Sequence, residues 1–226
     1  MRVERGAALA GFAFVATAIA TAVTETTGPD ITKTPAELTA KLVSDRADVI
    51  VNSAVSVAGA AAVLLLAATL ATLIMERGAP KVLARIVLCS GAVTAATKIL
   101  GAILSSADAS SIHALHDNQI VYLLFRGAQT ADTAAMIFFA VLLAASVAGL
   151  SAVGLLSRAS ARAGILTAGV LLVGGFDYLA PDAGPLSPIQ ALGAVLSLIY
   201  LIFLSTTLLR ADEPTTRAHD SLVATT

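Results

Sequence analysis

The sequence predicts an all-α, polytopic membrane helix bundle with six transmembrane helices and both termini in the cytoplasm. Only 13% of its 226 residues are charged and 57% are hydrophobic, whereas soluble domains carry about 25% charged residues. Apolar stretches long enough to cross about 30 Å of hydrocarbon recur along the chain, separated by shorter segments that contain Gly, Pro and charged residues. Lys and Arg residues concentrate in alternate connections, which is the pattern that sets membrane orientation.

The six predicted spans form one transmembrane domain over residues 1–209. They cover about 7–24, 49–75, 82–104, 129–156, 165–179 and 188–209. Residues 210–226 are polar and are expected to form a disordered cytoplasmic tail. Because Arg2 and Arg5 precede the first apolar stretch, a cleavable signal peptide is an alternative to the first span. We favour the uncleaved span, since the stretch is longer than the ~7–15 apolar residues of a usual signal peptide.

The second span is preceded by an amphipathic segment. Residues 34–37 (Thr-Pro-Ala-Glu) have the pattern of a capping box with Pro at the first helical position, so a helix is expected to begin at Pro35. The helical pattern then leads into the second span, either continuously to Glu76 or with a break near Asp48. Gly78 and Pro80 predict a tight turn before the third span.

The fourth span also belongs to a longer helical pattern. Residues 118–156 read as one helix, which is apolar enough to be a span only from Gln129 onward. Residues 105–117, just before it, are expected to form a polar loop. This loop contains His113, His116 and Asp117, which are too few and too weakly patterned to predict a metal site.

The charges indicate which side of the membrane each connection occupies. Nine Lys and Arg residues lie in the N-terminal head, the 76–85 turn, the 157–163 loop and the tail, and four lie in the other three connections. Because positive residues stay on the cytoplasmic side, both termini are expected there. The preference for Arg over Lys and the frequent Ala and Val are typical of a bacterium with GC-rich DNA, so the bacterial plasma membrane is the expected location.

Polar residues inside the predicted spans fall mainly in their external halves. Lys98 and Asp132 carry opposite charges on neighbouring spans, and buried charges in membranes usually face the bundle interior or each other. The candidates for ligand or ion binding are Asn52, Lys98, Gln129, Asp132, Asp177 and Tyr178. The cytoplasmic halves are almost purely apolar, so we expect a hydrated recess that opens outward above an apolar floor.

A purely structural interpretation of these residues is also open. Lys98 is about two turns from the outer end of its span, so its aliphatic stem can reach the interface. Asp132 can lie at headgroup level if the fourth span starts late, and Asp177 is one turn from the end of the fifth span. In that case Lys98 and Asp132 only pair with each other or with water.

The composition excludes several functions. A net charge of -1 gives no electrostatic basis for nucleic-acid binding. The single cysteine, Cys89, cannot form an intrachain disulfide and is expected to be a small packed residue. Because no nucleotide-binding, hydrolase or metalloprotease motif is present, no cofactor and no enzymatic activity are expected.

The predicted function is therefore that of a non-enzymatic membrane protein that binds a partner, a lipid or a small ligand from its external side. The alternative is a small transporter or channel-like protein that uses the polar recess, and a membrane-embedded enzyme is a third hypothesis. The lipid bilayer is the expected partner, with a protein partner or a homo-oligomer left open.

The order of these features resembles that of uncharacterised bacterial six-span membrane proteins grouped in a family of unknown function. The resemblance rests on the short head and first span, the external amphipathic stretch over 35–48, and the fourth span that ends in Leu155-Leu156-Ser157-Arg158 before a basic loop. A Pro usually follows the Ser-Arg pair in that family, and Ala159 stands here. The resemblance implies a six-span fold and no particular activity.

Overall fold

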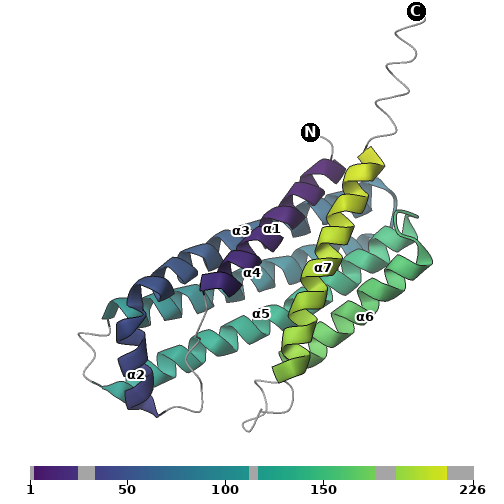
Figure 1. The fold of residues 1–226 in the computed structure, drawn as a ribbon. Helices are drawn as coiled ribbons and strands as arrows, with labels where there is room; N and C mark the ends of the chain where they lie inside the picture. The colour runs from purple at the N-terminus through teal and green to yellow at the C-terminus, as the bar shows by residue number, and fades with distance from the viewer. Residues whose placement is uncertain (1–2, 25–33, 112–116, 177–186, 213–226) are drawn as a thin grey trace, which may run out of the picture.

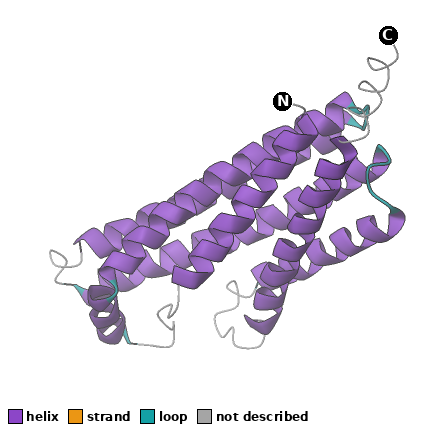
Figure 2. Cartoon of the chain, turned by 45° about the horizontal axis from the view of Figure 1, so that its top comes forward, coloured by secondary structure: helices purple, strands orange, loops and turns teal. Residues whose placement is uncertain are grey.

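The computed structural model describes residues 3–24, 34–111, 117–176 and 187–212, and every regular element in these ranges is an α-helix (Figure 2). The helices are α1 (Val3–Thr24), α2 (Pro35–Ser44), α3 (Arg46–Glu76), α4 (Lys81–Ser111), α5 (Asn118–Ala152), α6 (Arg158–Gly175) and α7 (Ser187–Asp212). The predicted all-α fold class is therefore confirmed for the described residues.

Five of the described helices, α1, α3, α4, α5 and α7, are long and apolar enough to cross a membrane. This length and composition are those of a membrane-embedded helical protein. The sixth long helix, α6, has 18 residues, begins with Arg158 and carries Arg162 one turn later, and it is not among the five. The six-span count and the orientation therefore stay predictions.

The six long helices form a closed ring. Each of α1, α3, α4, α5, α6 and α7 packs on the next, and α7 packs back on α1. The start of α1 and the end of α7 lie at the same end of the bundle (Figure 1). The short helix α2 lies at the opposite end, which we call the α2 end, and packs on α5 and α3.

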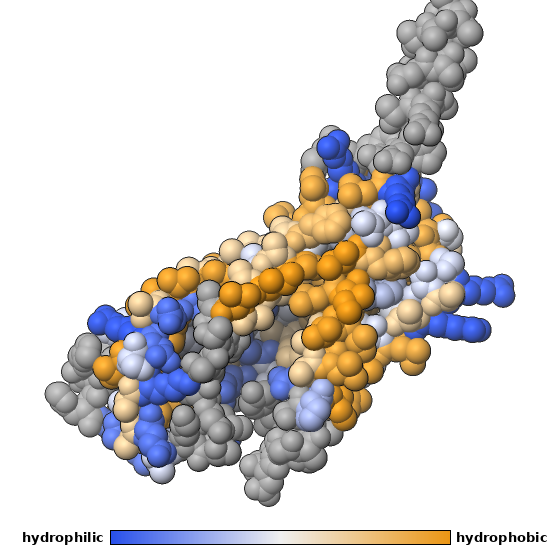
Figure 3. Space-filling view, viewed as in Figure 1, coloured by the Kyte–Doolittle hydropathy of each residue, from blue (hydrophilic) through white to orange (hydrophobic). Residues whose placement is uncertain are grey.

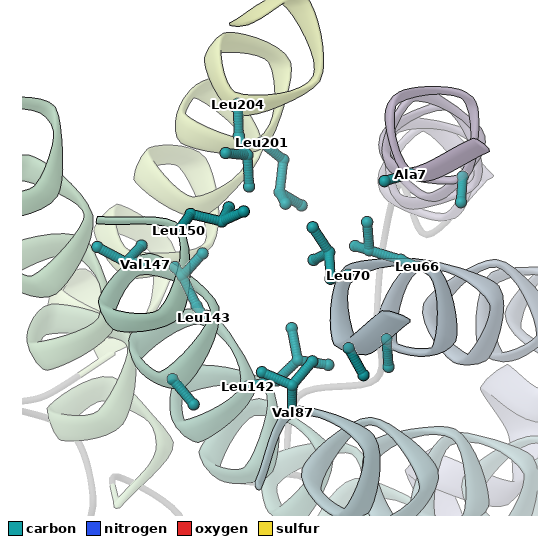
Figure 4. Close-up of a cluster of buried hydrophobic side chains, with 14 of the residues drawn as sticks. Ala7, Leu66, Leu70, Val87, Leu142, Leu143, Val147, Leu150, Leu201 and Leu204 are labelled. Atoms are coloured by element: carbon teal, nitrogen blue, oxygen red, sulfur yellow. The ribbon is translucent and has the colours of Figure 1, made fainter. Parts of the chain in front are cut away.

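The interior of the ring is filled by leucines away from the α2 end. Figure 4 shows these side chains pointing toward one another from α3, α5 and α7. We call them the leucine layer, and each is at most 1% exposed: Leu66, Leu70, Leu142, Leu143, Leu150, Leu201 and Leu204. An apolar layer is thus present in the described residues at the place where the sequence predicts an apolar floor.

Glycines allow neighbouring helices to approach closely. A Cβ atom added to Gly91 of α4 would lie 2.2 Å from the Cβ of Ala67 on α3. A Cβ on Gly193 of α7 would lie 2.9 Å from the Cα of Leu171 on α6. Lipid tails are as apolar as the helix surfaces, so the hydrophobic effect does not drive helices together in a membrane. Small residues at the interfaces instead allow the close packing that holds the helices together.

The connection between α2 and α3 agrees with one of the two sequence interpretations. The Thr34 hydroxyl accepts a hydrogen bond from the Glu37 backbone N–H, and the Glu37 carboxylate accepts one from the Thr34 N–H at 2.9 Å, so the capping box is confirmed. The helix then breaks at Asp45, whose φ and ψ are -101° and 14°. The apolar face of α2 packs on α5, where Leu38 and Leu42 are buried against Val121.

The turn between α3 and α4 is confirmed, whereas α5 ends earlier than expected. Gly78 has a φ of 83°, a backbone conformation that residues with a side chain rarely adopt.

Gly154 has a φ of 75° and directly follows the C-cap of α5, and the Leu155 N–H donates to the Leu150 carbonyl at 3.0 Å. This bond closes a helix-ending motif, so α5 stops at Ala152 and not at Leu156.

Two other expectations are wrong. The polar loop predicted over 105–117 is helical as far as Ser111, because α4 continues along α5 and no Gly or Pro interrupts it there. Cys89 is exposed on α4, not packed. The next residue, Ser90, is buried, and one residue turns a helix by about 100°, so Cys89 faces away from the bundle interior. His113 and His116 lie outside the described residues.

Candidate ligand pocket

A pocket of about 120 Å³ lies between α3, α4 and α5 at the α2 end of the bundle. Leu42 of α2 contributes to its wall, so the amphipathic helix borders the pocket. Its polar lining residues are Asn52, Ser53, Ser56, Ser105, Asp108, Gln129 and Asp132. A volume of this size has room for a few water molecules or a small ligand.

The pocket lies on the same helical faces that form the apolar core farther along the bundle. On α4, Val87, Thr94, Gly101 and Asp108 recur every two turns, and each of them is buried. On α3, Ser56 of the pocket is followed two turns later by the fully buried Val63. The interior of the bundle therefore changes from apolar to polar toward the α2 end.

Asp108 is the residue that the sequence interpretation missed. It was assigned to an external loop, yet α4 continues past it and its side chain is only 1% exposed. Its Oδ1 atom has no hydrogen-bond partner among the described residues. A buried carboxylate oxygen without a partner is costly, because the desolvated charge is not compensated. The two-turn spacing from Gly101 was the signal that could have identified Asp108 as part of the interior stripe.

Gln129 has a second oxygen in the same situation. Its Oε1 atom is buried and lacks a hydrogen-bond partner among the described residues, and the residue lines the pocket. Ser53, by contrast, donates to the Val49 carbonyl at 2.8 Å, so its hydroxyl is satisfied by its own helix. The uncompensated acceptors of the pocket are thus a carboxylate on α4 and an amide oxygen on α5.

Asp132 lies at the accessible edge of the pocket. Its carboxylate packs on Gly101, where an added Cβ atom would lie 2.9 Å from Asp132 Oδ1. Asp132 itself is exposed. Lys98 lies one turn before Gly101 on α4 and is close enough to Asp132 for a Coulombic interaction, but the two form no direct ion pair.

Three of the six candidates predicted from the sequence, Asn52, Gln129 and Asp132, line this pocket. Lys98 is adjacent to it through its interaction with Asp132. The remaining two, Asp177 and Tyr178, lie outside the described residues. The packing of α3, α4 and α5 therefore brings together residues that are 80 positions apart in the chain.

The surface view shows the same polarity. Hydrophobic residues cover much of the visible length of the helices, and hydrophilic residues gather at the two ends (Figure 3). Hydrophilic residues also lie in a hollow between the α2 end and α7 (Figure 3). No group of three or more His, Cys, Asp or Glu residues that could hold a metal ion occurs in the described part of the chain.

The interaction between Lys98 and Asp132 can be tested with a double-mutant cycle. The variants are Lys98→Met, Asp132→Asn and the double variant, and the measurement is the free energy of unfolding in detergent micelles. Because the side chains form no direct ion pair and Asp132 is exposed, the coupling energy is expected to stay below about 1 kcal/mol. A coupling of about 3 kcal/mol or more would mean that the two charges form a buried pair.

The resemblance to six-span proteins of unknown function remains a prediction, because comparison found no matching protein-family model, no matching curated protein and no matching solved structure.

Proposed function

We propose that this chain is a non-enzymatic protein of the bacterial plasma membrane that binds a small ligand from the external side in the pocket between α3, α4 and α5. The observation that carries the proposal is the pair of buried, unpartnered oxygens, Asp108 Oδ1 and Gln129 Oε1, at one pocket. Buried polar atoms almost always have a partner. A ligand that donates to these oxygens would supply it.

The distribution of positive charges supports an external position of the pocket. Arg77 follows α3 and Lys81 begins α4, and the start of α6 carries Arg158 and Arg162. These elements lie at the end where α1 starts and α7 ends, away from the α2 end. Positive residues mark the cytoplasmic side, so the pocket faces outward. In this arrangement α6 is a short sixth span, about 27 Å long at ~1.5 Å per residue.

Binding is favoured over transport by the closed inner part of the bundle. The leucine layer fills the ring between the pocket and the end that carries the basic residues. Helices α3, α4 and α5 have 31, 31 and 35 residues and run without interruption past the pocket. Many transporters instead place their substrate at broken helices near the membrane midplane.

Binding is also favoured over catalysis by the pocket lining. Within the part of the chain that the structure describes, the lining includes Asp and Ser side chains but no His, Cys, Lys or Arg. A serine needs an adjacent base to become a nucleophile. Ser53 instead donates to its own helix.

A ligand screen on the purified protein in nanodiscs tests this proposal. The probes are inorganic salts, alkylammonium salts, amino acids, simple sugars and small carboxylates, and the readout is the thermal midpoint of unfolding. A ligand present at 100 times its Kd stabilises the folded state by about 2.7 kcal/mol. At least one probe is expected to raise the midpoint.

Two serines on α4 provide matched variants for the screen. Ser105 lines the pocket, whereas Ser110 is exposed on the same helix outside it. Ser105→Leu fills the pocket and is expected to abolish the stabilisation, while Ser110→Leu keeps it. Stabilisation that survives in Ser105→Leu, or no stabilisation by any probe, contradicts the proposal.

A further inference from the structure

We infer that the ligand of this pocket is a small monovalent cation, either an alkali metal ion or a small ammonium ion, and that Asp108 is its main ligand. The inference rests on the proposed function and specifies its chemistry. It is carried by the charges of the pocket, by the burial of Asp108 and by the type of the surrounding donor atoms.

The first step concerns the sign of the charge. Among the described residues, the pocket lining contains two carboxylates, Asp108 and Asp132, and no positively charged side chain. Asp108 is 1% exposed, and its Oδ1 atom has no hydrogen-bond partner in the described part of the chain. A buried carboxylate is costly unless a positive charge or hydrogen-bond donors compensate it. An anion would add a like charge beside Asp108, and a neutral donor would leave the charge of Asp108 in place, so the lining favours a positive ligand.

The second step concerns the amount of charge. Lys98 lies close to Asp132 without forming a direct ion pair, and the formal charges of these two residues sum to zero. Asp108 then leaves one negative charge in and around the pocket, which one monovalent cation neutralises. Divalent Ca²⁺ prefers six to eight oxygen ligands and several carboxylates. The described residues provide no third acidic or His side chain at this place, so a monovalent ion is favoured.

The third step concerns the donor atoms. The polar atoms around Asp108 belong to hydroxyl and amide side chains, among them Ser105, Asn52 and the unpartnered Oε1 of Gln129. Oxygen ligands suit hard cations and ammonium groups, whereas sulfur and imidazole ligands select transition metals. Asp108 on α4 and Gln129 on α5 line the same pocket from two helices, so the inference places both side chains around the ion.

The experiment measures cation binding to the protein in nanodiscs. The background salt is N-methyl-D-glucamine chloride, whose cation is too large for a pocket of about 120 Å³. Sodium, potassium, ammonium and methylammonium chlorides are titrated, with isothermal calorimetry and the thermal midpoint as readouts. At least one cation is expected to bind saturably. Comparison of the affinities for sodium and potassium with those for ammonium and methylammonium shows which type of cation the site prefers.

Two aspartates at the same end of the bundle give matched variants. Asp108→Asn removes the buried carboxylate and is expected to weaken cation binding at least about tenfold, because a hydrogen bond or contact with a charged group is lost. Asp48→Asn removes an exposed carboxylate on α3 outside the pocket and is expected to leave the affinity unchanged. Should Asp108→Asn fail to fold, Gln129→Met is the second variant, and it is expected to lower the affinity by loss of the amide oxygen.

The outcomes separate this inference from the proposed function. The cation assignment is overturned if none of the four cations binds, or if Asp108→Asn and Asp48→Asn bind equally well. If a neutral or zwitterionic probe then binds in a manner that Ser105→Leu abolishes, the proposed function stands without a cation. If Ser105→Leu changes no binding of any probe, both fail.

Discussion

Replacing Gly91 with alanine is expected to lower the free energy of unfolding by about 1–3 kcal/mol, which is the usual cost of overpacking. The new Cβ atom would lie 2.2 Å from the Cβ of Ala67 and 3.1 Å from Leu142 Cδ1. The Ala67 methyl group has no rotamer that moves it away, so α3 and α4 must separate to relieve the clash. The effect is measured as a change in thermal midpoint and unfolding free energy in the same micelles.

Gly169 provides the control for this substitution. It is exposed on α6, and an added Cβ atom would have no heavy atom within 4 Å. Gly169→Ala is therefore expected to be neutral or to stabilise the protein by about 0.5–1 kcal/mol through helix propensity. Equal effects of the two substitutions would show that α3 and α4 do not pack through Gly91.

Replacing Leu142 with alanine is expected to have a larger effect, a loss of about 2–5 kcal/mol. Leu142 is fully buried in the leucine layer, where it faces Val87 of α4 and lies near Leu70 of α3 (Figure 4). Truncation leaves a cavity lined by side chains from three helices, which cannot close without moving a helix. Unfolding in a denaturing detergent, followed by circular dichroism, measures the loss.

Leu123 is the matched control on the same helix. It is 67% exposed on α5, so Leu123→Ala removes no packed contact and is expected to change stability by about 0.5 kcal/mol or less. If Leu142→Ala were as mild as Leu123→Ala, the leucine layer would not be a packed barrier. The preference for binding over transport would then lose its main support.

Helical periodicity explains what could be predicted from the sequence. Residues that recur at helical spacing share a face whatever the surrounding fold, so the polar positions Asn52, Gln129 and Asp132 were expected to gather and do line one pocket. The capping box at Thr34 could be predicted for a similar reason, since it depends only on four consecutive residues. The helix face that each residue occupies and the capping box are both determined locally in the chain.

Features that depend on tertiary packing could not be predicted in this way. The segment 105–111 is polar and contains neither Gly nor Pro, so it can be a loop or the last turns of a helix. Packing decides between them: α4 extends along α5 up to the α2 end, and this extension buries Asp108. The prediction that Cys89 is packed was wrong because neighbouring residues of a helix face different surroundings. In a helix that is apolar on all sides, composition does not reveal which of them faces the interior.

The measurement that tests the central claim most directly is the accessibility of single cysteines from each side of the membrane. Cys89→Ser first removes the exposed native thiol. Ser56→Cys then places a thiol in the pocket, and Ala159→Cys places one at the exposed start of α6 at the other end of the bundle. A membrane-impermeant thiol reagent is added to intact spheroplasts and, separately, to inside-out vesicles.

The account predicts that Ser56→Cys reacts from the external side only and that Ala159→Cys reacts from the cytoplasmic side only. The pocket would then open outward above a leucine layer that the reagent does not cross. Reaction of Ser56→Cys from the cytoplasmic side would contradict the account, because it would mean either that the orientation is reversed or that the leucine layer is open.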